Sequence, residues 1–158
     1  MAARSSLARA DDRTLVLERV FDAPLSLMWQ CWTEPQHLER WSAPRGFTIP
    51  CCEGDLRPGG KWRCQMRSPE GNTLWLGGVY REIVVNRRLV MTHAWEEDGM
   101  PGRETLVTVR FEDLGGKTRV TLEQAGFDSA GARDGHLGGW SECFDLLAEH
   151  LATQGAQS

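Results

Sequence analysis

The segment that decides the fold is residues 137–151, LGGWSECFDLLAEHL, near the C-terminal end of the chain. Large apolar residues recur in it at steps of three and four, which predicts a helix with one apolar stripe. These residues are Leu137, Trp140, Phe144, Leu147 and Leu151. Asp128 or Ser129 is the expected N-cap. A helix of this kind must cover an apolar surface formed by the rest of the chain.

The residues between Phe47 and Ala125 have the period of two that is typical of strands. In residues 61–67, Trp62, Cys64 and Met66 alternate with charged or polar neighbours, as in a strand that is covered on one face. The expected strands are residues 14–21, 61–67, 74–85, 89–95, 104–111 and 118–125. Turns join them, and Gly77-Gly78 permits a bend or bulge within a strand. The sequence therefore predicts an antiparallel meander.

Two short helices are expected between the first strand and the meander. Asp22 is a candidate cap for the first helix, and Glu34-Pro35 ends it and begins the second. Strand, two helices, meander and long helix define an α+β helix-grip fold: a curved antiparallel sheet of six or seven strands around the C-terminal helix. The expected domain is residues 14–152, with flexible tails at 1–13 and 153–158.

Length and charge restrict the class of protein. The chain has 158 residues, which suits one domain. Its net charge is −4 and it has no Lys/Arg cluster, so no binding of nucleic acid is expected. No apolar run approaches the ~20 residues that span a bilayer, and the first residues do not resemble a secretory signal. We therefore expect a cytoplasmic protein without membrane insertion.

The five cysteines and four histidines show no metal-site spacing. An odd cysteine count without a C-x-x-C pair argues against a disulfide framework and a zinc site. Cys51-Cys52 is read as two small apolar strand residues, with a vicinal disulfide or a reactive thiol as the alternative. No nucleotide-binding or catalytic motif is present. The sequence predicts no metal and no cofactor, and assigns no catalytic residue.

A strongly curved sheet around a helix leaves space between the two, and large side chains would line that space. The expected ligand-binding residues are Trp62, Cys64, Met66, Tyr80, Met91, His93, Trp95, Trp140 and Phe144. Apolar cavities with a few polar groups are the usual sites for small molecules. The alternative for each residue is that it only fills a core. His93 could orient a ligand or act as a general base near its ordinary pKa of about 6.5, or it could be a buried, paired histidine.

Several motifs together resemble the activator of heat-shock-protein-90 ATPase homologue family. They are residues 20–24 (VFDAP), residues 32–35 (WTEP), residues 55–62 (DLRPGGKW), Gly126-Phe127 and the Gly138–Trp140 segment. The resemblance extends over residues 14–152 and implies membership of the START-like (SRPBCC) superfamily, which has the helix-grip fold. The eukaryotic members that stimulate the chaperone ATPase carry an additional N-terminal domain. The family name is therefore not carried over as a function. Since the family has no fixed catalytic set, the resemblance implies the position of a pocket and no catalytic residues.

Three functions follow as hypotheses. The first is binding of a hydrophobic or aromatic small molecule, such as a lipid or polyketide, between the sheet and the C-terminal helix. The second is an enzyme of the cyclase, hydrolase or isomerase type that uses His93 or Tyr80 in the same cavity. The third is a chaperone cofactor or regulatory module, which requires an exposed apolar patch on the outer sheet face. An edge strand could also pair in a homodimer.

Overall fold

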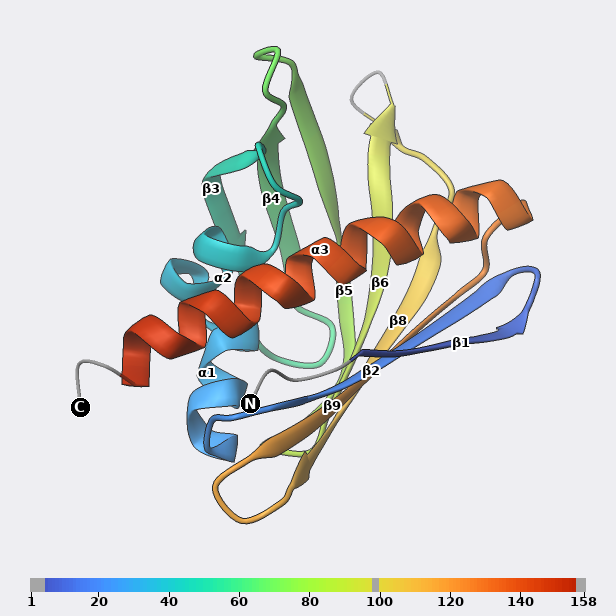
Figure 1. Cartoon of the computed structure of the whole chain (residues 1–158). Helices are drawn as coiled ribbons and strands as arrows, with labels where there is room; N and C mark the ends of the chain where they lie inside the picture. The colour runs from blue at the N-terminus through green and yellow to red at the C-terminus, as the bar shows by residue number, and fades with distance from the viewer. Residues whose placement is uncertain (1–4, 98–99, 156–158) are drawn as a thin grey trace.

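The computed structural model describes residues 5–97 and 100–155, which form a curved antiparallel sheet crossed by one long helix (Figure 1). The strands are β1 (Ser5–Asp11), β2 (Thr14–Phe21), β3 (Thr48–Gly54), β4 (Lys61–Arg67), β5 (Thr73–Val84), β6 (Arg88–Glu97), β7 (Met100–Pro101), β8 (Thr105–Asp113) and β9 (Thr118–Ala125). The helices are α1 (Leu25–Thr33), α2 (Pro35–Trp41) and α3 (Ala130–Gly155). The expected α+β helix-grip fold is confirmed.

The strands lie in the order β1-β2-β9-β8-β6-β5-β4-β3, and the short β7 pairs with β6. Each paired neighbour is antiparallel, so the chain forms a meander whose first hairpin adds to β9. The six strands expected from the sequence all form, three of them with the expected bounds. β3 extends the meander at one edge. All the helices in Figure 1 lie on one side of the curved sheet.

Residues from both expected tails form regular secondary structure. Ser5–Asp11, expected to be flexible, pairs with β2, because β2 bonds to β9 on one side only and leaves its other edge open to a further strand. The C-terminal helix continues through Thr153 to Gly155, and residues 156–158 lie outside the described part. Asp22 does not cap α1, because Pro24 occupies the N-cap position without a side-chain hydrogen bond.

Strand β5 approaches its neighbours β4 and β6 closely at Gly77-Gly78. A Cβ atom at Gly78 would lie 1.9 Å from the Thr92 carbonyl oxygen, and one at Gly77 would lie 2.6 Å from the Trp62 carbonyl oxygen. Only glycine allows such close approach of neighbouring strands. The register irregularity itself falls two residues later, between Tyr80 and Glu82. Gly77-Gly78 thus permits the close approach of the strands, and the bulge lies further along β5.

α3 begins at the expected cap and runs diagonally over the sheet (Figure 1). The Ser129 hydroxyl accepts a hydrogen bond from the Ala132 N–H at 3.1 Å. The main core lies between the C-terminal half of α3, α1 and the strands β2, β8 and β9, and includes Phe21, Leu122, Phe144 and Leu147. Within the described residues, no helix has the length and apolar character needed to cross a membrane.

Candidate ligand-binding cavity

A cavity of about 500 Å³ lies between the sheet and the N-terminal half of α3. Eight of the nine residues expected at the site line it: Trp62, Cys64, Met66, Tyr80, Met91, His93, Trp95 and Trp140. They come from β4, β5, β6 and α3. The alternation of β4 therefore correctly predicted which face of that strand is covered. Leu56 and Leu74 also line the cavity while being 42% and 38% exposed, so the cavity reaches solvent near these residues.

Phe144 was wrongly placed at the cavity. It is fully buried and makes edge contacts with Phe21 and Trp32, whose ring centroids lie 5.6 and 6.1 Å away. One turn separates it from Trp140, and α3 passes from the cavity to the filled core between the two residues. Helical spacing places both residues on one stripe but does not show where along the helix the underlying space ends.

The two short helices form a wall of the cavity that the sequence did not predict. Trp32, Leu38 and Trp41 line it, together with Thr33 and Pro35. The rings of Trp32 and Trp41 meet edge to face with centroids 4.6 Å apart. The Trp41 indole N–H donates to the Cys31 carbonyl oxygen at 2.9 Å, which fixes α2 against α1. Trp32 and Trp41 therefore both pack the two short helices together and line the cavity.

Glycines on the cavity side of α3 leave space between this helix and the sheet. Gly135 and Gly139 both line the cavity, and a Cβ atom at Gly135 would meet no other atom within 4 Å. Glycine disfavours a helix by about 1 kcal/mol relative to alanine, so packing or function must offset this cost. Here the glycines keep the helix surface flat where the cavity lies. The flanking Trp140 then forms the boundary between cavity and core.

A buried polar network holds Trp140 in place. The Trp140 indole N–H donates to the Gln124 side-chain oxygen at 2.8 Å, and the Gln124 amide donates to the Thr105 hydroxyl at 2.8 Å. The Thr105 hydroxyl in turn donates to the His93 carbonyl oxygen at 3.1 Å. Gln124 is fully buried in β9, so each of these bonds replaces one with water. Gln124 and Thr105 were not among the residues expected at the site.

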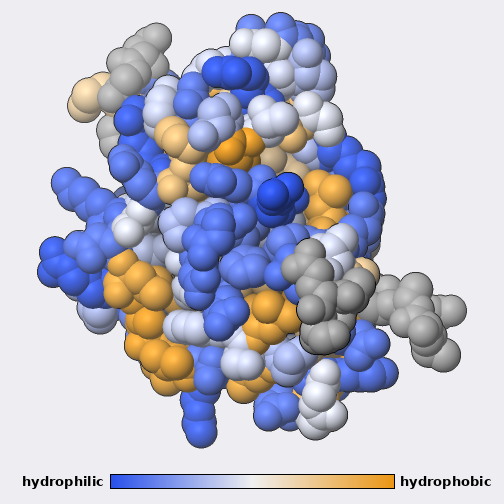
Figure 2. Space-filling model, turned by 90° about the vertical axis from the view of Figure 1, so that its left-hand side faces the viewer, coloured by the Kyte–Doolittle hydropathy of each residue, from blue (hydrophilic) through white to orange (hydrophobic). Residues whose placement is uncertain are grey.

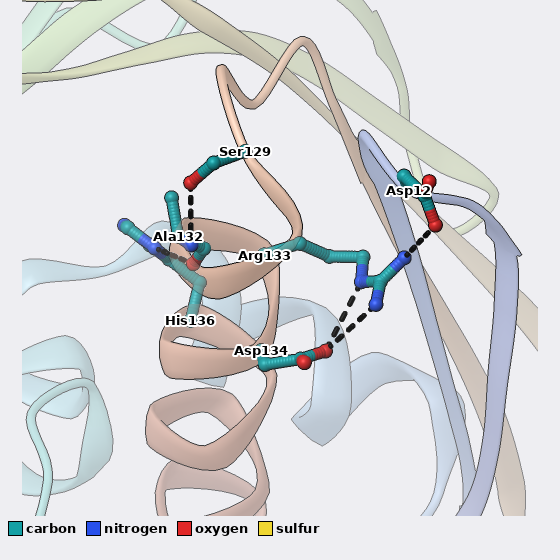
Figure 3. Close-up of polar contacts among 6 residues, drawn as sticks. All are labelled: Asp12, Ser129, Ala132, Arg133, Asp134 and His136. Carbon is teal, nitrogen blue, oxygen red and sulfur yellow. Dashed lines mark hydrogen bonds and ion pairs between the residues drawn. The ribbon is translucent and has the colours of Figure 1, made fainter.

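His136 orients the polar side of the cavity wall. Its Nε2 accepts a hydrogen bond from the Trp95 indole N–H at 3.1 Å, and its Nδ1 lies 2.8 Å from the Ala132 carbonyl oxygen. An indole N–H only donates and a carbonyl oxygen only accepts, so the proton of His136 must be on Nδ1. In Figure 3, His136 leaves the first turns of α3 on the side opposite to Arg133.

Arg133 connects the beginning of α3 to the β1–β2 hairpin. Its guanidinium donates to Asp134 at 3.0 Å and lies 3.5 Å from the Asp12 carboxylate (Figure 3). The arginine itself is buried, whereas Asp12 is largely exposed. Strand β1, which the sequence analysis assigned to a flexible tail, thus belongs to the hairpin that holds the helix end. The residues of this contact do not line the cavity.

His93 is buried in the cavity wall between Trp62 and Trp95, with ring centroids 5.8 Å from each. Burial, and the nearby His136, lower the pKa of His93 to about 4. Of the alternatives left open for His93, a general base with an ordinary pKa is therefore not supported, whereas burial agrees with the interpretation of a buried histidine. The ring is neutral at pH 7. Burial also raises the pKa of Tyr80, which keeps its hydroxyl protonated. Both residues are neutral groups that can form hydrogen bonds with a ligand.

Cys52 and Cys64 form a disulfide between the paired strands β3 and β4. The sequence analysis argued against disulfides, because an odd cysteine count gives no pairing and Cys52 was considered only with its neighbour Cys51. The register decides the matter: Cys52 lies opposite Cys64, with the Cα atoms 4.1 Å apart, whereas Cys51 points outward and is exposed. The disulfide is part of the cavity lining.

The face seen in Figure 2, which carries α1, α2 and the C-terminal part of α3, is mainly hydrophilic with separate hydrophobic patches. On the outer face of the sheet, the guanidinium of Arg63 covers the Trp75 ring at 3.8 Å and forms an ion pair with Glu96. The apolar surface of Trp75 is thus partly shielded from solvent. Around Trp75, the described residues of the outer sheet face therefore do not form the large continuous apolar patch that an interaction module requires.

A cupped antiparallel sheet, a long helix across it and an apolar cavity between them define a helix-grip domain of the START-like (SRPBCC) class. Members of this class commonly bind hydrophobic ligands. The chain belongs to the family described as activator of Hsp90 ATPase homolog 1-like protein (AHSA1), whose model matches residues 22–152. The family resemblance noted in the sequence is confirmed.

Solved structures agree with this assignment. A protein from Nitrosomonas europaea is 29% identical, with a TM-score of 0.80, over 94% of this chain and 99% of that one. An AHSA1 protein from Silicibacter pomeroyi is 25% identical, with a TM-score of 0.81, over 89% and 99%. A protein from Arthrobacter aurescens shares the fold at 24% identity, with a TM-score of 0.83, over 94% and 91%. A search of curated proteins found no match.

Proposed function

We propose that the protein binds a hydrophobic or aromatic small molecule in the cavity between the sheet and α3. The observation that carries this proposal is the cavity itself: about 500 Å³, lined mainly by apolar side chains and open to solvent. Sites for small molecules usually have roughly 300–1,000 Å³ and a few oriented polar groups. A lipid, a polyketide or a related metabolite has the required apolar surface.

Desolvation of apolar surface would supply most of the affinity, at roughly 25 cal/mol per Å² before the costs of association. Flat walls for an aromatic ring are provided by Trp32, Trp62, Trp95 and Trp140. Tyr80 and His93 would fix the orientation of a ligand through a carbonyl or hydroxyl group. Since both are neutral at pH 7, the proposed ligand is uncharged where it meets them.

The proposal is tested by a ligand screen with a matched pair of variants. Met91 lines the cavity, whereas its neighbour Val90 does not. We expect hydrophobic ligands to raise the melting temperature of the wild type and of Val90→Trp, and to be retained in native mass spectra. Met91→Trp places a larger side chain in the cavity and should weaken both effects. If no hydrophobic ligand stabilises the wild type, or if Met91→Trp binds as well as Val90→Trp, the proposal fails.

Location and assembly belong to the same proposal. We propose that the protein is cytosolic. Most thiols are kept reduced in the cytosol, so the Cys52–Cys64 disulfide would there exchange with its dithiol form. Alkylation of thiols in intact cells before lysis measures that state. We also keep the homodimer as a proposal, with β1 and β3 as the two edges of the sheet. Light scattering of the purified protein tests it.

A further inference from the structure

Three metal-ligand side chains from three different helices meet outside the cavity. They are Cys31 of α1, His37 of α2 and His150 of α3. The His37 Nδ1 and His150 Nε2 atoms lie 2.8 Å apart, and the Cys31 sulfur lies 3.8 Å from His37 Nδ1. The three ligand atoms are all within 4.8 Å of one another. No spacing pattern predicts this cluster, because residues 37 and 150 are distant in the chain.

These separations are close to those of a tetrahedral metal site. Zinc bonds of about 2.0–2.1 Å to nitrogen and 2.3 Å to sulfur imply ligand separations of roughly 3.3 Å between nitrogens and 3.6 Å between sulfur and nitrogen. The two histidine nitrogens would therefore move apart by about half an ångström, while the Cys31 sulfur already lies near the required distance from His37. The separation between Cys31 and His150, which is within 4.8 Å, would have to reach roughly 3.6 Å. Both histidine side chains are only partly buried, so rotation about their side-chain bonds can supply this adjustment.

The alternative to a metal is a hydrogen bond between the two histidines. Such a bond can use one proton only, and it leaves the Cys31 sulfur in a weak contact with the same His37 nitrogen. A cation would satisfy all three ligand atoms at once. The nearby charges offset one another, because Glu34 lies within electrostatic reach of Cys31 and Arg40 within reach of His150.

We propose that Cys31, His37 and His150 bind a divalent cation of the zinc class. One sulfur and two imidazole nitrogens are a ligand set that such cations prefer, and three protein ligands leave a fourth position for water. Three metal–ligand bonds form, and the Cys31 thiol releases its proton to solvent as it becomes a thiolate. Because Thr33 and Pro35 line the cavity between Cys31 and His37, the bound metal would also stiffen that wall.

The experiment uses the untagged chain, freed of metal with a chelator and titrated with Zn²⁺ alone by calorimetry. One Zn²⁺ per chain should bind, and His37→Gln and His150→Gln should each weaken binding by more than about tenfold. Co²⁺ should give the visible spectrum of a tetrahedral site with a thiolate charge-transfer band, and Cys31→Ser should remove that band. Cys51→Ser, which changes an exposed thiol outside the cluster, is the matched control and should leave both signals unchanged.

Folding is checked for each variant by circular dichroism, and the two histidine variants replace partly exposed residues. Loss of binding in folded His37→Gln and His150→Gln, with retention in Cys51→Ser, supports the site. Absence of one-to-one binding by the wild type overturns it. So does binding that survives both histidine substitutions. None of these results depends on whether the cavity holds a ligand, so the two proposals stand or fall separately.

Discussion

Gln124 links Trp140 to Thr105 and, through Thr105, to His93, and it has no contact with solvent. It accepts a hydrogen bond from Trp140 and donates one to Thr105. We expect Gln124→Leu to leave the Trp140 N–H without a partner and to lower the free energy of unfolding by about 1–3 kcal/mol. Urea denaturation followed by circular dichroism measures this loss. A double-mutant cycle with Trp140→Phe should show coupling, because both substitutions break the same bond.

The control for Gln124 is its neighbour Glu123, which is partly exposed on the opposite face of β9. Glu123→Gln should change the free energy of unfolding by no more than about 0.5 kcal/mol. The hydrogen-bond account fails if Gln124→Leu is as mild as this control. It also fails if the effects of Gln124→Leu and Trp140→Phe simply add.

His93 should make stability depend on pH. Its pKa in the folded protein is about 4, below the value of about 6.5 in an unfolded chain. Above pH ~6.5 the ring is neutral in both states and has no effect. As the pH falls from ~6.5 towards ~4, only the unfolded state takes up the proton, so the free energy of unfolding decreases, by a loss on the order of 3 kcal/mol.

The measurement compares wild type with His93→Gln in urea at several pH values between 7 and 4. The carboxylates and His136 are common to both proteins, so the difference between the two curves reports His93. We expect the difference to be constant above pH ~6.5 and to change in favour of the variant below it. Parallel curves throughout this range would show that His93 titrates normally in the folded protein.

Single residues were predictable from the sequence where a regular pattern constrained them. The alternation of residues 61–67 correctly placed Trp62 and Met66 on the covered face. Gln124 was missed although a signal existed, because it continues the inward series of Val120 and Leu122 in β9. A polar residue at an inward position of a regular strand requires a partner. Which partner it finds depends on tertiary packing, and the alternation of residues along the strand does not determine this packing.

Strand β5 requires glycine where it passes close to β6. A Cβ atom at Gly78 would lie 1.9 Å from the backbone of Thr92, so Gly78→Ala must push β5 and β6 apart. We expect a loss of about 3 kcal/mol or more in the free energy of unfolding, or failure to fold. Gly138→Ala in α3 is the matched control. Its Cβ atom would meet nothing within 4 Å, and the gain in helix propensity should stabilise the protein by up to about 1 kcal/mol.

The hairpin of β3 and β4 should be sensitive to redox conditions. The Cys52–Cys64 disulfide closes a loop with a sequence separation of 12 residues. In the chain-entropy model, such a crosslink stabilises by about 2–3 kcal/mol. We expect Cys52→Ala to lower the free energy of unfolding by this amount under oxidising conditions and to have little effect when a reductant is present. Titration of thiols in denaturant should give three per chain before reduction and five after it.

Elements were easier to predict than the contacts between them. Strands β2, β4 and β9 have the expected bounds because turn residues and regular alternation define them. The disulfide was missed because it depends on the register of β3 against β4, which two adjacent cysteines do not reveal. The His37–His150 contact was missed for a similar reason. It depends on how α2 meets the end of α3, and neither helix contains that information.

The molecule has a filled half and a hollow half. Beneath the C-terminal part of α3, residues of β2, β8, β9 and α1 form a continuous core. Beneath its N-terminal part, a smaller cluster that includes Met66 and Leu76 lines the cavity instead. The filled half provides a continuous core, whereas the hollow half leaves apolar surface open at the cavity. This division explains why Trp140 and Phe144, one turn apart, have different surroundings.

The division predicts that the same substitution has different effects in the two halves. Leu122→Ala creates a new void in the filled core and should cost about 2–5 kcal/mol. Leu76→Ala enlarges a cavity that already exists, so it should cost at least about 1 kcal/mol less, because no separate void forms. Binding of a hydrophobic dye should show the reverse, with a change in Leu76→Ala and none in folded Leu122→Ala. Equal losses of stability, with dye binding unchanged in both variants, would mean that the hollow half is packed like the core.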